Sequence, residues 1–147
     1  MESGTSIYRT RAALRWADID ANFHLRHTVF YDLGSEQRIN MLAAADVTMG
    51  YMQQHQFGPV LFREECRFLR EVRIEDAIEV ELRITGLSPD FRKFAFQHRF
   101  LRGEEPCAVV RVEGAWFNTA TRKVFVPPQL LIDALERAPR AEDFTWL

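Results

Sequence analysis

The stretch of this 147-residue sequence that decides its fold is Trp16-Ala17-Asp18-Ile19-Asp20-Ala21-Asn22-Phe23-His24-Leu25-Arg26-His27. It places two carboxylates two residues apart and two imidazoles three residues apart, between a strand-like segment and a helix-like segment. A helix that begins here would direct its unpaired backbone N–H groups, and the positive end of its dipole, toward the same short loop. If the chain performs chemistry, we expect it in this loop.

The segments on either side of the loop predict a strand and a helix. Tyr8, Ala12, Leu14 and Trp16 take even positions, with Arg9, Arg11 and Arg15 between them, which is typical of a half-buried strand. Apolar side chains then recur on a helical period over residues 27–45, and no proline interrupts this segment. These apolar positions are not confined to one stripe, which predicts a helix buried on much of its surface. A second short helix is predicted over 47–55, ended by Gly58-Pro59.

The rest of the chain has mainly the pattern of strands. They are predicted over residues 60–72, 76–86, 94–100 and 108–116, with short polar turns between them. A short helix is predicted over 129–137, and residues 138–147 give no readable pattern. Consecutive strands joined by short turns form antiparallel sheets. The sequence therefore predicts an α+β fold, with a curved antiparallel sheet around one long central helix.

The composition restricts the class of protein. With 47% hydrophobic and 27% charged residues, the chain is globular, and its length fits one domain spanning residues 1–147. A net charge of −2 without a basic stripe argues against a nucleic-acid partner. No apolar run is long enough for a membrane span or a secretory signal, and Cys66 and Cys107 are expected to be buried thiols in a reducing compartment. We therefore expect a cytoplasmic protein with no membrane partner.

Three stretches, in order along the chain, carry a resemblance to a known family. They are the Asp-x-Asp loop at 18–27, the run Phe68-Leu69-Arg70 that leads to Asp76 and a strand, and the segment 116–127 before the last helix. Together they resemble the hot-dog fold, and within it the 4-hydroxybenzoyl-CoA thioesterase-like family of acyl-CoA thioesterases. The resemblance covers roughly residues 8–137. It implies a homodimer or homotetramer that hydrolyses an acyl-CoA to a free acid and coenzyme A, without a metal or organic cofactor.

The resemblance also implies roles for individual residues. Asp20 would be the nucleophile or the base that activates water, and the backbone amide of His27 would bind the thioester oxygen. His24 could be a further catalytic group, and a partner subunit could bring Glu64 or Glu65 to the site. Two carboxylates that lie close together would raise the pKa of one of them.

Three aromatic residues are candidates for contact with the substrate. Phe30 and Tyr31 open the long helix, where they could line an acyl tunnel or belong to the core. Phe23 stands where the family often has glycine, a residue that allows close backbone approach to a ligand. The family also has a proline where this chain has Glu71.

Other interpretations remain open at this stage. Asp20 could be a helix N-cap, and Asp18 is expected to cap or hydrogen-bond the loop. His24 and His27 have the spacing of a metal pair but no convincing further ligand. A group of arginines could pair with the phosphates of coenzyme A or form a solvated strand face, namely Arg63, Arg67, Arg70 and Arg73.

Two other functions fit the same fold, because one fold hosts many functions. One is a hydratase or dehydratase, in which His24 or a glutamate moves a proton next to the thioester carbonyl. The other is a non-catalytic protein that binds acyl-CoA or lipid.

Overall fold

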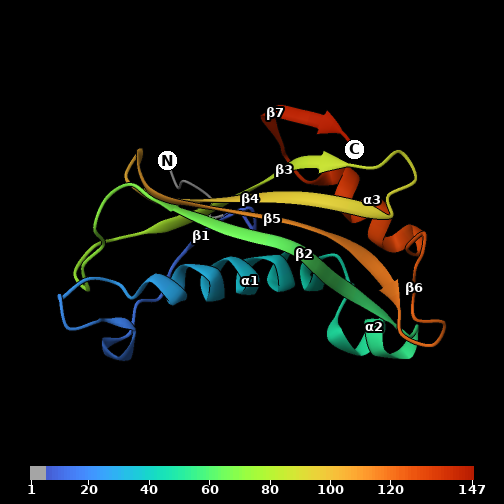
Figure 1. The fold of residues 1–147 in the computed structure, drawn as a ribbon, viewed down its shortest axis with the longest axis horizontal. Helices are drawn as coiled ribbons and strands as arrows, with labels where there is room; N and C mark the ends of the chain where they lie inside the picture. The colour runs from blue at the N-terminus through green and yellow to red at the C-terminus, as the bar shows by residue number, and fades with distance from the viewer. Residues whose placement is uncertain (1–5) are drawn as a thin grey trace.

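The computed structural model describes residues 6–147, and its central element is the 18-residue helix α1 (His27–Ala44). This helix lies along one face of a curved sheet (Figure 1). The strands are β1 (Arg9–Arg11), β2 (Phe57–Phe68), β3 (Glu79–Leu87), β4 (Lys93–Arg102), β5 (Glu105–Asn118), β6 (Lys123–Val124) and β7 (Arg140–Trp146). Two shorter helices are α2 (Met49–Gln54) and α3 (Gln129–Arg137).

The sheet order confirms the predicted α+β architecture. The main sheet runs β1-β3-β4-β5-β2, while β6 pairs with β5 and β7 pairs with β3. Among the strands of residues 6–147, every pairing is antiparallel except that of β7 with β3, which is parallel. The central helix, the curved sheet and the short C-terminal helix are therefore arranged as the hot-dog resemblance predicts.

Two predicted segments differ from the structure, and one strand has no counterpart in the prediction. The strand expected over 8–16 is confined to β1, because residues 16–18 turn into a single 3₁₀ helix. β2 begins at Phe57 and ends at Phe68, so Gly58-Pro59 does not end the preceding segment. Proline is tolerated here because β2 is an edge strand, and one row of its N–H groups has no partner strand in the described part of the chain. β7 was not predicted, since its charged residues do not alternate with apolar ones.

Helix α1 is buried on one stripe only, so the prediction of burial on much of its surface is wrong. Residues on the sheet side are buried, and the opposite face, with Asp32, Glu36 and Asn40, is exposed. The reason is that one concave sheet covers one side of the helix. Apolar side chains from alternate positions of β3, β4 and β5 form the core against it, among them Leu82, Phe100 and Val110.

A polar network joins the middle of α1 to β4 inside this core. His98 is fully buried, with Nδ1 2.8 Å from Gln37 Oε1 and Nε2 2.9 Å from Arg38 Nη1. A guanidinium can only donate, so His98 Nε2 accepts and Nδ1–H donates to Gln37. Gln37 Nε2 in turn donates to the carbonyl of Val80 at 2.6 Å. Burial, and to a smaller degree the charge of Arg38, lower the pKa of His98 to about 3.

Two further sequence predictions can be compared with this fold. No helix within residues 6–147 is long and apolar enough to cross a bilayer. Cys107 is a buried free thiol as predicted, whereas Cys66 is only partly buried because it lies on the edge strand β2.

The His98 network predicts a specific acid sensitivity. The unfolded chain protonates His98 below its ordinary pKa of 6.5, while the folded chain keeps it neutral down to about 3. The contribution of neutral His98 to the free energy of unfolding is therefore fully present above pH 6.5. As the pH falls from 6.5 to about 3, the free energy of unfolding decreases by up to about 1.4 kcal/mol per pH unit for this one proton. Urea unfolding at a series of pH values measures this dependence. In His98→Gln the free energy of unfolding should depend less steeply on pH than in the wild type. The exposed His55→Gln control should keep the wild-type slope, and an unchanged slope in His98→Gln would contradict the assignment.

Candidate active site

The loop before α1 folds around the carboxylate of Asp20. Asp20 Oδ1 accepts hydrogen bonds from the backbone N–H groups of Asn22 at 2.9 Å and His24 at 3.3 Å. The backbone N–H of Asp20 donates to the His24 carbonyl, and that of Phe23 donates to the Asp20 carbonyl, each at 3.0 Å. Within residues 6–147, Asp20 Oδ2 has no hydrogen-bond partner. One carboxylate oxygen is thus held in place while the other is free to act.

Asp18 has a structural position next to this loop. Its carboxylate is buried, and it accepts from Arg15 Nη2 at 2.8 Å and from the Arg15 backbone N–H at 3.0 Å. The Arg15 side chain, whose hydrogen bonds favour the charged form, lowers the pKa of Asp18. The Asp18 carbonyl accepts from the N–H of Arg26 at 2.7 Å. These contacts confirm that Asp18 hydrogen-bonds the loop.

A cleft of about 310 Å³ opens beside Asp20 and includes the start of α1. Its lining consists of Asp20, His24, Leu25, His27, Phe30, Phe68, Leu69, Arg70, Glu71 and Val72. We call it the Asp20 cleft. The N-cap of α1 is Arg26, so Asp20 is not the N-cap residue. Among residues 6–147, no acceptor pairs with the backbone N–H of His27 or Thr28. The cleft therefore combines a free carboxylate oxygen with unpaired N–H groups at a helix N-terminus.

The imidazole of His24 lies in the same cleft but contacts a different carboxylate. His24 Nε2 is 2.7 Å from Glu71 Oε2, and the backbone of His24 is what holds Asp20. Glu71 was not among the predicted site residues. The only signal for it was its position, where the resembling family has a proline.

The structure brings only part of the predicted substrate-contact set together. Phe30 lines the Asp20 cleft and packs edge-on against Phe68 at 5.6 Å between ring centroids. Tyr31 packs against the core, and Phe23 projects into solvent with 70% of its surface exposed. Neither of them lines the cleft.

The two strand glutamates also lie outside the Asp20 cleft of their own chain. Glu64 Oε2 is 3.7 Å from Arg38 Nη2, and Glu65 Oε2 is 2.6 Å from Arg63 Nη2. Their predicted contribution from a partner subunit stays a prediction.

Comparison with known protein families finds a match over most of the chain. The sequence model of the thioesterase-like superfamily matches residues 14–135. No curated protein matches the chain.

Solved structures share the fold at low sequence identity. One is Slr0204, a 1,4-dihydroxy-2-naphthoyl-CoA thioesterase from Synechocystis, with a TM-score of 0.79 and 17% identity over 88% of this chain and 96% of that one. Another is the gentisyl-coenzyme A thioesterase BH1999, with a TM-score of 0.73 and 18% identity over 88% and 99%. A third is SAV2348 from Staphylococcus aureus, solved in complex with CoA, with a TM-score of 0.79 and 14% identity over 95% and 89%. These likenesses confirm the hot-dog fold.

The loop geometry at Phe23 generates a prediction about stability. Phe23 has φ of 66°, the left-handed region that favours glycine, and its side chain is mostly exposed. Phe23→Gly should remove this backbone strain and raise the free energy of unfolding by roughly 1 kcal/mol. Phe23→Ala keeps the Cβ atom and serves as the control that should show no such gain. Urea unfolding measures both, and a destabilised glycine variant would show that the Phe23 ring stabilises the loop.

Proposed function

The chain belongs to the thioesterase-like superfamily, and we propose that it hydrolyses an acyl-CoA thioester to a free acid and coenzyme A. The observation that carries this proposal is the free Oδ2 of Asp20, in the same cleft as the unpaired first-turn N–H of His27. Thioester hydrolysis needs a nucleophile or base on one side of the carbonyl and hydrogen-bond donors for the oxygen that gains charge. The Asp20 cleft offers both.

The proposed reaction begins at the thioester carbonyl carbon. Asp20 Oδ2 attacks this carbon, or it removes a proton from a water molecule that attacks. The carbonyl oxygen gains negative charge and accepts hydrogen bonds from the start of α1, where the helix dipole favours that charge. The carbon–sulfur bond then breaks and coenzyme A leaves as the thiolate. In the first route water hydrolyses the acyl–Asp20 anhydride to the free acid and Asp20, and in the second the free acid forms directly. In both routes the proton left on Asp20 passes to the coenzyme A thiolate or to water.

The hydrogen bonds of the loop support this role for Asp20. The N–H groups that hold Oδ1 fix the direction of the carboxylate, so it needs little reorganisation to reach the substrate. Asp18, the other acid of the motif, is buried and paired with the exposed Arg15, so it is not available for the reaction.

We also propose that the working form contains two copies of the chain, as a homodimer or within a homotetramer. Within residues 6–147, β2 pairs with β5 on one side only and has no partner strand at its other edge. Along β2 the large apolar side chains of Leu61, Phe62 and Phe68 are 44%, 62% and 54% exposed. A free strand edge with exposed apolar groups favours pairing with another chain.

The contact between His24 and Glu71 supports a second candidate function, that of a hydratase. His24 and Glu71 form a histidine–acid pair inside the Asp20 cleft, and such a pair could move a proton next to a thioester carbonyl. A hydratase acting on an enoyl-CoA would use this pair and would leave the thioester intact.

Replacement of Asp20 tests the proposal. In Asp20→Asn the amide oxygen can still accept from Asn22 and His24, so the loop keeps its fold, but the charged oxygen is lost. We expect kcat to fall by about 10²- to 10⁴-fold, measured as thiol release from a panel of aliphatic and aryl acyl-CoA substrates. Asp32→Asn, at an exposed position of α1, is the matched control and should keep the wild-type rate.

The possible outcomes separate the candidate functions. If the wild-type protein releases thiol from none of the substrates, it is not an acyl-CoA thioesterase. Loss of an enoyl-CoA without thiol release would favour the hydratase, and binding without turnover would favour a non-catalytic protein. Full activity of Asp20→Asn would overturn the role of Asp20 alone.

A further inference from the structure

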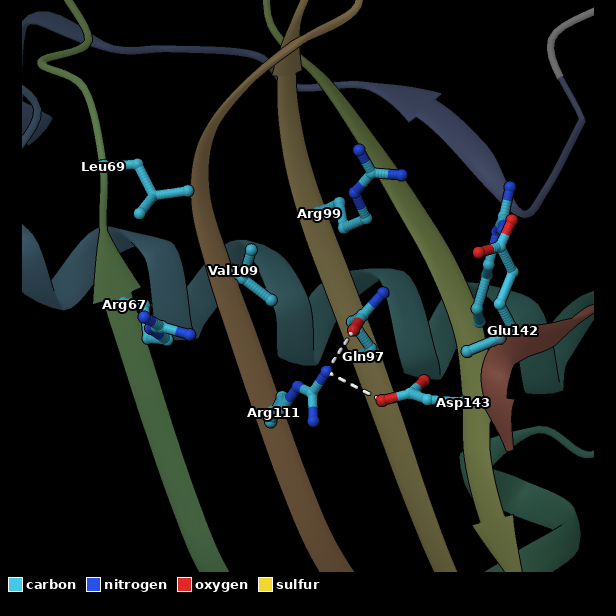
Figure 2. Close-up of a pocket in the computed structure, with 10 residues that line it drawn as sticks. Arg67, Leu69, Gln97, Arg99, Val109, Arg111, Glu142 and Asp143 are labelled. Carbon is cyan, nitrogen blue, oxygen red and sulfur yellow. Dashed lines mark hydrogen bonds and ion pairs between the residues drawn. The ribbon is translucent and has the colours of Figure 1, made fainter. Parts of the chain in front are cut away.

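A second concave site lies on the face of the sheet opposite α1. It has a volume of about 430 Å³ and is lined by Arg67, Leu69, Arg83, Gln97, Arg99, Val109, Arg111, Ala141, Glu142 and Asp143. We call it the outer hollow. Figure 2 shows Arg67, Arg99 and Arg111 on three neighbouring strands in front of the sheet, with a helix behind it.

The strand register explains why these arginines gather. Arg67 of β2 lies opposite Val109 of β5, which lies opposite Arg99 of β4. In the next row of the same face, Arg111 of β5 lies opposite Gln97 of β4. Side chains two residues apart on a strand share a face, so both rows point away from α1.

The positive charge of the outer hollow is only partly compensated. Glu81, whose side chain is 13% exposed, is shared by Arg83 at 3.2 Å and Arg99 at 3.5 Å. Within residues 6–147, Arg67 has no carboxylate at ion-pair distance. Arg111 contacts Asp143 at 3.1 Å, but both side chains are about half exposed. Exposed ion pairs of this kind contribute little, so an incoming anion can replace Asp143 at small cost.

The C-terminal segment forms one wall of the outer hollow. The pairing of β3 with β7 jumps from Ile84–Arg140 to Gly86–Thr145, so residues 141–144 leave the ladder. Glu142 and Asp143 of this segment line the hollow, and Figure 1 shows β7 on the side of the sheet away from α1. This wall lies beyond residues 14–135, the part that the superfamily model matches.

The outer hollow adjoins the Asp20 cleft. Leu69 lines both of them, just beyond the end of β2. The backbone N–H groups of Leu69 and Arg70 both donate to the Cys107 carbonyl, at 2.8 and 2.9 Å, which fixes this junction. A ligand long enough to pass Leu69 could occupy both sites.

Of the four arginines that the sequence singled out as phosphate partners, the structure places one in the outer hollow. Arg67 lines the outer hollow and Arg70 lines the Asp20 cleft. Arg63 contacts Glu65 at 2.6 Å and Arg73 contacts Glu71 at 3.4 Å, outside the outer hollow.

We propose that the outer hollow binds the phosphate groups of a nucleotide through Arg67, Arg99 and Arg111. Guanidinium groups match phosphate oxygens and stack on planar rings, and the side-chain amide of Gln97 adds a donor. The volume exceeds that of one phosphate, and the apolar Leu69, Val109 and Ala141 give a surface for a base or sugar. The nucleotide is either the end of coenzyme A, in which case the inference rests on the proposed function, or a separate effector.

Binding of adenosine 3′,5′-bisphosphate, which carries no thioester, tests the site itself. Calorimetry should show that the double variant Arg67→Gln/Arg99→Gln binds it at least about tenfold more weakly than the wild-type chain, because each lost contact is a hydrogen bond to a charged group. Arg63→Gln removes one positive charge from β2 outside the outer hollow, and this control should bind the bisphosphate like the wild type. Circular dichroism and thermal unfolding check that the variants are folded. Equal binding by the double variant, or none by the wild type at millimolar ligand, would overturn the proposal.

Kinetics identifies the source of the nucleotide. If it belongs to coenzyme A, the double variant should raise KM for an acyl-CoA and leave KM for the matching acyl-pantetheine, which lacks the nucleotide, unchanged. If it is a separate effector, KM for both substrates should stay the same and the bisphosphate should not compete with acyl-CoA. If the bisphosphate binds in an arginine-dependent way but the protein has no thioesterase activity, the outer hollow is still a nucleotide site. Only the proposed function would then be overturned.

Discussion

Two backbone hydrogen bonds at the start of α1 are the constraint on which the candidate site depends. The N–H of Leu25 donates to the Val72 carbonyl and that of Arg26 to the Asp18 carbonyl, both at 2.7 Å. They tie the loop of Asp20 to the segment between β2 and β3 and to the 3₁₀ turn before it. The first turn of α1 is thereby set beside the carboxylate. Together with the hydrogen bonds from Asn22 and His24 to the Asp20 carboxylate, they fix the position of its free oxygen relative to the unpaired N–H groups.

The rest of α1 is positioned by apolar packing against the sheet and by side-chain hydrogen bonds to His98. The apolar stripe packs against the concave face of the sheet, while Gln37 and Arg38 meet His98 and fix the helix along its own axis. A Cβ at position 34 would come within 3.1 Å of the His98 ring, so the absence of a side chain there allows the close approach. Apolar packing alone is non-directional, and a hydrogen-bonded network in the core specifies one position. Because the contacts with His98 fix α1 along its axis, they also fix the position of its first turn in the Asp20 cleft.

The sequence predicted the elements that have strong periodicity. The strict alternation around Val80 and Leu82 gave a strand, and the helical period after His27 gave α1 within one residue of its observed end. It failed where tertiary contacts override local pattern. Trp16 continues an alternating run, but the Arg15–Asp18 contacts turn the chain there. Gly58-Pro59 predicts a break in the chain, yet the edge position of β2 tolerates the proline.

The candidate site was predictable only in part. Asp20 and the helix start follow from the motif and the resemblance, but Glu71 enters the cleft through the folded path of the chain after β2. The outer hollow could not be predicted, because its arginines come together through the register of β2, β5 and β4. The wall formed by residues 141–144 could not be predicted either. It depends on the break in the pairing of β7 with β3, and the sequence pattern does not predict β7.

A structure of the protein with a coenzyme A ketone analogue, in which a methylene group replaces the thioester sulfur, tests the roles of Asp20 and of the start of α1. We expect the ketone oxygen within about 3 Å of the backbone N–H of His27 or Thr28. The carbonyl carbon should face Asp20 Oδ2 at about 3 to 3.5 Å, or through one water molecule if Asp20 is the base. A carbonyl bound away from both groups, or an analogue bound outside the Asp20 cleft, would contradict the account.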